Sequence, residues 1–206
     1  MKKIRFSALF LALSLSAVSA FSCNEMPESS QEQSIIMLDP NEPVSEKPNK
    51  YSSDSKKTNS AFGQEIEVNN TVFTLNDVVN IGSPANNEND YVYINVTIKN
   101  NTDIEYEINS LNNFFVALPD QTEILSNVRT KLYAINNYPK CVDDPITIPA
   151  NGEFSGYLAG GFVVPSGTDS LTVGFFPTLD NDIDRANVIL SPVTPENLSH
   201  DDSVLK

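Results

Sequence analysis

The chain has 206 residues, a formal net charge of −14 at pH 7 and 40% hydrophobic residues. This length is enough for one ordinary domain with additional segments, and the modest hydrophobic content indicates that part of the chain is not packed. A negative field repels phosphate backbones and anionic headgroups, so we expect neither nucleic-acid binding nor electrostatic docking on a membrane.

The first 22 residues have the layout of a secretory signal peptide. Three basic residues at positions 2, 3 and 5 precede an apolar run over residues 6–20. This run is shorter than the ~20 residues that a membrane-spanning helix needs. The sequence therefore predicts export of the chain.

The residues that follow fit two alternative routes of signal-peptide cleavage. Cleavage after Ala20 would release a free, secreted protein. Alternatively, residues 20–23 (AFSC) resemble the bacterial lipobox, in which the cysteine becomes the acylated first residue. We favour the second route, which makes Cys23 the lipid-attachment residue and places the protein on the bacterial cell surface.

Residues 24–60 are rich in Ser, Pro, Glu, Asn and Lys. Such a composition cannot bury enough apolar surface to offset the entropy of ordering, so it predicts a disordered tether with a reach of roughly 30 Å. The predicted organisation is a signal peptide over 1–22, a lipid-attachment cysteine and linker over 23–60, a folded domain over 61–190, and a polar tail over 191–206.

The state of the two cysteines, Cys23 and Cys141, depends on whether Cys23 is acylated or the chain is cleaved after Ala20. If Cys23 is acylated, Cys141 remains as a free, buried thiol. If Cys23 is not acylated, a disulfide between the two can form in an oxidising compartment.

Residues 91–99 alternate apolar and polar side chains, with Val92, Ile94, Val96 and Ile98 on one face. This period of two predicts a half-buried antiparallel strand. Residues 100–103 (NNTD) have turn chemistry, and the alternation resumes over 104–108. The stretch therefore predicts a β-hairpin.

Further short strands are predicted along the chain, and no segment shows helical periodicity over a helical length. This pattern favours an all-β, immunoglobulin-like, two-sheet antiparallel β-sandwich after a disordered N-terminal tether. The other predicted strands cover residues 65–68, 71–81, 114–118, 128–135, 146–148, 154–164, 170–176 and 187–190.

Three motifs resemble a family of bacterial surface lipoproteins with a telokin-like, immunoprotective extracellular domain (domain of unknown function 4352). They are the strand and turn over 92–101, the segment FVALPD over 115–120, and the element from Pro149 to Pro165. The sequence departs from the family pattern at Asn151-Gly152-Glu153, and Ala159-Gly160-Gly161 lengthens the last strand. The resemblance implies an immunoglobulin-like sandwich on a cell-surface anchor.

The sequence shows no recognisable catalytic motif. The only histidine, His200, lies in the predicted tail, where nothing holds it beside a nucleophile. We therefore predict a non-enzymatic protein without catalytic residues, metal ligands or cofactors.

Asp180, Asp182 and Asp184 have the spacing that opens a calcium-binding loop. Arg185 stands where a glycine is needed and Ser191 where the closing Glu is needed, so a solvated acidic loop is the favoured interpretation. The alternative function is a secreted metal-dependent carrier or enzyme that uses these acidic residues.

Tyr91 and Tyr93 share the face of their strand that is predicted to point outward, and exposed tyrosines often form contact surfaces. The leading hypothesis is a cell-surface lipoprotein, tied to the membrane by a lipid on Cys23. Its immunoglobulin-like module would present the tyrosine face to an unidentified extracellular or envelope macromolecule.

Overall fold

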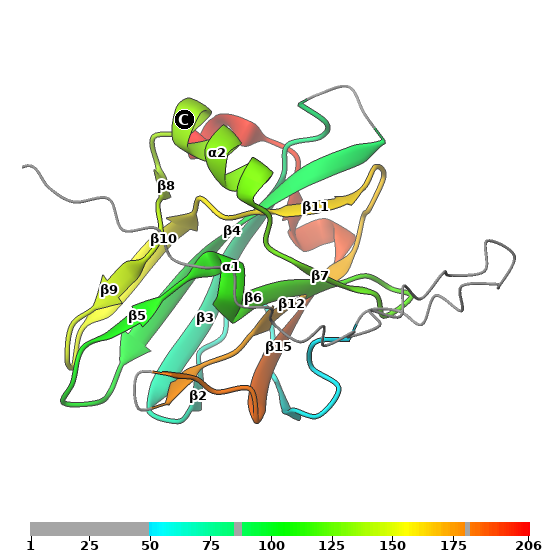
Figure 1. Cartoon of the computed structure of the whole chain (residues 1–206). Helices are drawn as coiled ribbons and strands as arrows, with labels where there is room; N and C mark the ends of the chain where they lie inside the picture. The colour runs from blue at the N-terminus through cyan, green and yellow to red at the C-terminus, as the bar shows by residue number, and fades with distance from the viewer. Residues whose placement is uncertain (1–49, 85–87, 180–181) are drawn as a thin grey trace, which may run out of the picture. The chain divides into compact units, whose positions relative to one another are not determined.

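Two β-sheets packed face to face form the folded domain (Figure 1). The computed structural model describes residues 50–84, 88–179 and 182–206, which belong to one unit, Ser45–Lys206. The predicted signal peptide, Cys23 and residues 24–49 lie outside the described residues. The predicted all-β, two-sheet sandwich is confirmed.

The larger sheet has the strand order β16–β3–β4–β10–β8, with β2 paired to β3 and β11 paired to β4. Its central pairs are antiparallel, whereas β16 and β8 add to its edges in parallel. The strands are β2 (Ile66–Val68), β3 (Thr71–Asn80), β4 (Asn89–Asn100), β8 (Cys141–Val142), β10 (Glu153–Leu158), β11 (Phe162–Pro165) and β16 (Leu198–Ser199).

The smaller sheet has the order β1–β15–β12–β6–β7, in which β1 is parallel to β15. Its strands are β1 (Lys56–Asn59), β6 (Phe114–Ala117), β7 (Glu123–Leu125), β12 (Leu171–Phe175) and β15 (Asn187–Val193).

Two short antiparallel ladders and four helical segments complete the described part of the domain. The ladders are β5 (Tyr106–Ile108) with β9 (Ile146–Ile148), and β13 (Thr178–Leu179) with β14 (Asp182–Ile183). The helical segments are α1 (Ser110–Asn113), α2 (Val128–Asn137), and the 3₁₀ helices η1 (Pro195–Asn197) and η2 (Asp202–Leu205).

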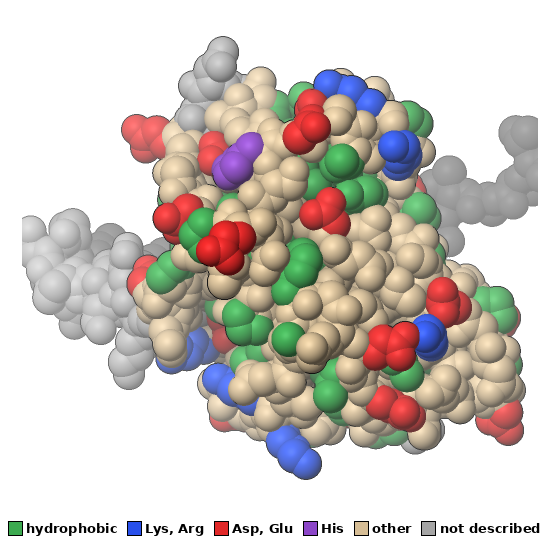
Figure 2. All heavy atoms as spheres, turned by 180° about the vertical axis from the view of Figure 1, so that it is seen from behind, with side chains coloured by type: hydrophobic (Ala, Val, Ile, Leu, Met, Phe, Trp, Pro, Cys, Tyr) green, Lys and Arg blue, Asp and Glu red, His purple; other side chains and the backbone are tan. Residues whose placement is uncertain are grey.

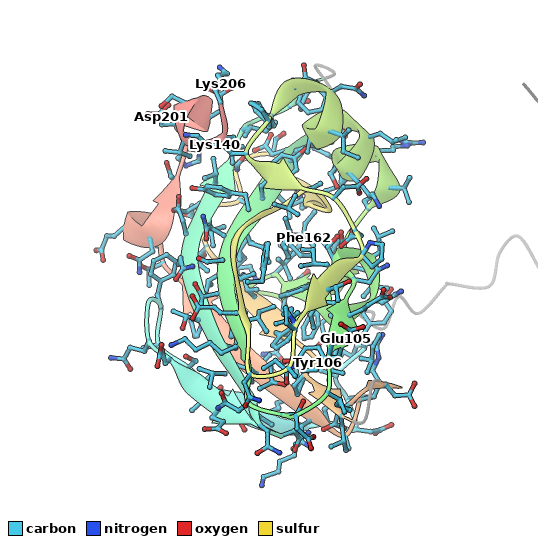
Figure 3. The ribbon with its side chains drawn as sticks, turned by 90° about the vertical axis from the view of Figure 1, so that its left-hand side faces the viewer. Glu105, Tyr106, Lys140, Phe162, Asp201 and Lys206 are labelled. Atoms are coloured by element: carbon cyan, nitrogen blue, oxygen red, sulfur yellow. The ribbon has the colours of Figure 1, made fainter. Side chains whose placement is uncertain are left out.

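The main core fills the space between the sheets. The ring of Phe175 stacks on Phe73 and Phe114, with centroid separations of 4.8 and 4.9 Å. Phe162 lies between the layers as well (Figure 3). These rings bury large apolar areas, and this burial is the principal force that holds the two sheets together.

The first half of strand β4 is buried on both faces. Val92, Ile94 and Val96 face the main core, while Tyr91 and Tyr93 belong to a second core on the outer side of the sheet. The prediction of a half-buried strand is therefore wrong for this half and confirmed for the second half, where Asn95, Thr97 and Lys99 are partly exposed. The predicted hairpin is also wrong, because β4 pairs with β3, β10 and β11, whereas β5 pairs with β9.

Residues 128–135, predicted as a strand, lie in helix α2. The side chain of Asn127 caps the helix by accepting a hydrogen bond from the backbone N–H of Arg129 (2.8 Å). Thr130 and Ala134, one helical turn apart, are buried against the sheet. The apolar residues that suggested a strand are exposed instead: Val128, Leu132 and Ile135.

The predicted linker extends too far into the domain. Residues 56–59 form β1, whose side chains are mostly exposed and whose main chain pairs with β15. Just before it, the buried carboxylate of Glu123 accepts hydrogen bonds from the backbone N–H groups of Tyr51 and Ser52 and from the Ser52 hydroxyl. Backbone pairing and this carboxylate order residues that composition alone predicts to be disordered.

The predicted boundary of the tail, at residue 191, is also wrong. Strand β15 continues to Val193, and β16 and η2 pack on the larger sheet and its second core. Leu205 is fully buried in that core. The tail therefore belongs to the fold.

We expect Leu205→Ala to lower the free energy of unfolding by about 2–4 kcal/mol, because it opens a cavity in the second core. The matched control Leu132→Ala, at a residue that is 57% exposed, should change it by no more than about 0.5 kcal/mol. Urea unfolding followed by circular dichroism measures both. Equal effects of the two substitutions would contradict the assignment of the tail to the fold.

Candidate functional site

The tyrosines predicted to form a binding face are buried. Tyr93 is fully buried and donates a hydrogen bond from its hydroxyl to the carbonyl oxygen of Thr130 (2.8 Å). Tyr91 is 9% exposed, and its ring meets that of Tyr133 edge to face at 5.7 Å. Because α2 and the C-terminal segment cover this side of the sheet, these rings are structural, and the prediction of a tyrosine contact face is wrong.

The surroundings of the tyrosine cluster keep its hydroxyls protonated. Burial raises the pKa values of Tyr93, Tyr138 and Tyr157 above the usual value of a tyrosine. Two of these hydroxyls also donate to carboxylates, Tyr138 to Asp202 (3.1 Å) and Tyr157 to Asp77 (2.5 Å). A nearby negative charge disfavours a phenolate and therefore adds to the shift.

Cys141 forms no disulfide with another described residue and lies at the border of the same cluster. Burial raises its pKa to about 11, so only a small fraction is ionised at neutral pH. Because the thiolate is the reactive form, this position is unsuited to nucleophilic chemistry.

The acidic loop is divided between structural and exposed positions. Asp184 is 8% exposed and accepts hydrogen bonds from the Ala186 backbone N–H (2.9 Å) and the side-chain amides of Asn187 (2.7 Å) and Asn69. Asp182 is exposed in β14, and Asp180 lies outside the described residues. Among the residues that the structure describes, no group of three or more His, Cys, Asp or Glu side chains could hold a metal ion.

A cleft of about 470 Å³ lies at the end of the sandwich where three turns meet. The strands that lead into these turns end on the side of the domain away from α2 (Figure 1). Tyr106 marks this end, opposite Lys140, Asp201 and Lys206 (Figure 3). The cleft, called the asparagine cleft below, is lined by Asn69, Asn70, Asn101, Thr102, Asp103, Ile104, Tyr106, Asn151, Thr178 and Leu179.

Asparagine occupies the turn positions because the backbone there is left-handed. Asn69 and Asn70, between β2 and β3, have φ values of 54° and 56°, and Asn151, between β9 and β10, has a φ of 54°. Among residues with a side chain, asparagine tolerates this conformation best. A tight two-residue hairpin turn requires two successive left-handed residues, so this turn accounts for the asparagines at positions 69 and 70.

The fully buried side chain of Asn100 connects two walls of the cleft. Its amide group donates to the carbonyl oxygens of Ile104 (2.7 Å) and Pro149 (3.0 Å). Its carbonyl oxygen accepts from the backbone N–H (2.9 Å) and hydroxyl (2.6 Å) of Thr102. The backbone N–H of Asn151 in turn donates to the Thr102 carbonyl oxygen (2.9 Å), so the loop after β4 is bound to the turn before β10.

The groups that face the asparagine cleft are mostly neutral and hydrogen-bonding. No described residue forms a hydrogen bond with the side-chain amides of Asn70 and Asn151. Of the described residues that line the cleft, Asp103 is the one acidic residue. Thr178, only 4% exposed, has a buried hydroxyl with no hydrogen-bond partner among the described residues.

Sequence reasoning missed this site. It used the Asn-Asn pairs at 69–70 and 100–101 and the Asn151-Gly152 pair only as turn signals. The signal that could have revealed the site was the recurrence of asparagine at three turns. Whether those turns meet depends on strand pairing, which the sequence pattern does not give.

Elsewhere on the described domain, the surface carries a mixture of charged, polar and hydrophobic side chains. On the face in Figure 2, acidic and basic side chains are interspersed, and hydrophobic side chains occur in separate small groups. His200 is exposed. No helix within the described ranges is long and apolar enough to cross a membrane.

The family model described as "Domain of unknown function (DUF4352)" matches residues 60–182, which include every lining residue of the asparagine cleft. This match supports the predicted family but not its description as telokin-like or immunoprotective. No curated protein matches the chain.

Three solved structures are similar in fold. The Bacillus subtilis protein ycdA, described as a "putative lipoprotein", is 16% identical with a TM-score of 0.47, over 64% of this chain and 38% of its own. Bacillus subtilis yjhA is 14% identical with a TM-score of 0.45, over 65% and 98%. An uncharacterized beta-sandwich protein of Clostridium difficile is 15% identical with a TM-score of 0.41, over 71% and 99%. This chain thus spans well under half of the length of ycdA.

In a Cys23→Ser chain, we expect Cys141 to react with a disulfide reagent roughly 100-fold more slowly at about pH 8 than after unfolding in guanidinium chloride, because its raised pKa leaves little thiolate. The absorbance of the released thiol measures both rates. A folded-state rate equal to the unfolded one would show that the thiol is neither buried nor shifted.

Stability should fall as the pH rises above about 10. In the folded protein the pKa values of Tyr93, Tyr138 and Tyr157 are raised, so an unfolded chain releases protons that the folded chain retains. The stabilisation is complete below the unfolded pKa and is lost above it. Tm measured against pH, with tyrosinate absorbance, tests this expectation.

Tyr138→Phe should make this alkaline loss of stability shallower, whereas Tyr51→Phe, at a residue that is 42% exposed, should leave it unchanged. If the two variants have the same pH profile, the buried cluster is not the source of the effect.

Proposed function

This chain belongs to the family described as a domain of unknown function (DUF4352), and from this membership and the asparagine cleft we propose that it is a non-enzymatic, lipid-anchored binding module of the bacterial cell surface. Cys23 carries the lipid, and the sandwich presents the asparagine cleft to an extracellular or envelope ligand.

The observation that carries the binding role is the group of asparagine residues at the turns that line the cleft. Buried Asn100 holds two of the turns together, and the backbone at Asn70 and Asn151 is left-handed. A carboxamide neither gains nor loses a proton near neutral pH, so it recognises a ligand by donating and accepting hydrogen bonds. A cleft of about 470 Å³ is within the size range of small-ligand sites.

The anchor rests on the sequence of the leader. The basic residues, the apolar run over 6–20 and the lipobox-like residues 20–23 favour acylation of Cys23 after export. Two acyl chains on one residue would give stable membrane attachment, whereas a single chain binds only marginally. The polar segment that follows Cys23 would then separate the binding domain from the membrane.

Fractionation of a bacterium that processes lipoproteins tests the anchor. We expect the wild-type chain in the membrane fraction, labelled by a fatty-acid analogue. Cys23→Ala should be unlabelled and released, with an unchanged Tm because residue 23 does not belong to the unit Ser45–Lys206 that contains the sandwich. The matched control Cys141→Ala should be labelled and retained like the wild type. A mature wild-type chain that begins with unmodified Phe21 would overturn the anchor.

A further inference from the structure

We infer that the asparagine cleft binds a neutral saccharide unit; this inference rests on the proposed binding function and specifies its ligand class. Four features of the cleft support it: the donors and acceptors of its carboxamides, the unpaired hydroxyl of Thr178, the exposed aliphatic side chains and the charge.

The hydrogen-bonding groups of the cleft match the hydroxyls of a sugar. Each carboxamide supplies two donors and an acceptor side by side, and each sugar hydroxyl is both a donor and an acceptor. Asn70 and Asn151 line the cleft from two different turns, and their exposed side-chain amides make no hydrogen bond to any described residue. A ring carrying neighbouring hydroxyls can therefore satisfy both amides.

A second, independent observation is the buried hydroxyl of Thr178. This residue lines the cleft, is 96% buried and has a hydroxyl oxygen without a partner in the described part of the chain. Buried polar atoms in folded proteins nearly always have a hydrogen-bond partner. Because this oxygen is itself shielded from solvent, a ligand hydroxyl would reach it only by displacing the side chains that cover it.

The cleft also offers aliphatic contact. Ile104 and Leu179 line it and are 44% and 47% exposed. The faces of a pyranose ring carry C–H groups that can pack on such side chains, while its edges hold the hydroxyls. A combination of apolar contact with a few fixed polar groups is typical of small-ligand sites.

Charge disfavours acidic ligands. Among the described lining residues, Asp103 is the one acidic residue, and none is Lys, Arg or His. A carboxylate accepts hydrogen bonds from hydroxyls but repels phosphate, sulfate and carboxylate groups. The cleft therefore selects an uncharged sugar over a phosphorylated or acidic one.

The test is isothermal titration calorimetry of the mature Cys23→Ser chain against a panel of probes. The panel contains two neutral trisaccharides (maltotriose and chitotriose), an acidic counterpart (trigalacturonic acid) and a neutral peptide (tetra-alanine). We expect at least one neutral trisaccharide to bind, with no binding of the acidic counterpart.

The matched variants keep the backbone conformation. Asn70→Gly with Asn151→Gly removes both amides while retaining left-handed turns, and it should weaken saccharide binding by at least about tenfold. The control Gln121→Gly removes an amide from another left-handed residue, outside the cleft (φ 71°), and should bind like the parent chain. Near-ultraviolet circular dichroism and Tm establish that each variant is folded.

Each outcome decides the inference. It is overturned if neither trisaccharide binds, if the acidic sugar binds equally well, or if the double variant binds as the parent does. Binding of the peptide alone, lost in the double variant, would overturn the saccharide while retaining the proposed binding function. Lack of fatty-acid labelling at Cys23 would remove the anchor and leave the saccharide result unaffected.

Discussion

The arrangement of the candidate site depends on the buried carboxamide of Asn100. One side chain with no solvent exposure bonds to Thr102 and Ile104 on one loop and to Pro149 on another. Leaving a buried polar group without its partners costs about 1–3 kcal/mol, so this network strongly favours a single arrangement of the two loops. The cleft is thus formed before any ligand arrives, which lowers the entropic penalty of binding.

The two ends of the domain have different roles. At one end, α2 and the C-terminal segment cover Tyr91 and Tyr93 and complete a second core. At the other end, no comparable helix covers the turns within the described residues, and their polar side chains remain accessible. A rigid sandwich that presents loops at one end is a common arrangement for binding proteins, because the scaffold fixes positions while the loops carry the recognition groups.

The sequence predicted the strands well where the signal was local. Asn69-Asn70 between two alternating runs correctly predicted β2, the tight turn and β3. The sequence pattern does not predict which strands pair with each other. Strand β5 pairs with β9, almost forty residues later, rather than with its neighbour β4. Helix α2 was misread because its exposed apolar residues imitate a strand, while Thr130 and Ala134 are the residues that face the core.

Neither the boundaries of the folded domain nor the asparagine cleft could be predicted from the sequence, and the reasons are related. Strand β1 is held by main-chain hydrogen bonds to β15, which leave no trace in composition, and the tail is anchored by a few widely spaced buried side chains, Val193, Leu198 and Leu205. Similarly, alternation indicates that Tyr91 and Tyr93 share a face but not that a later helix covers that face. The asparagine cleft joins residues 69, 101, 151 and 178, which only the tertiary fold brings together.

The most direct measurement of the central claim is amide hydrogen exchange in Asn100→Asp. This substitution keeps the size of the side chain but turns a donor into a carboxylate facing the carbonyl oxygens of Ile104 and Pro149. If Asn100 holds the cleft together, the amide of Asn151, which donates to Thr102, should exchange roughly tenfold faster or more, while the amides that pair β3 with β4 keep their protection. Unchanged protection at Asn151 would show that the cleft does not depend on this side chain.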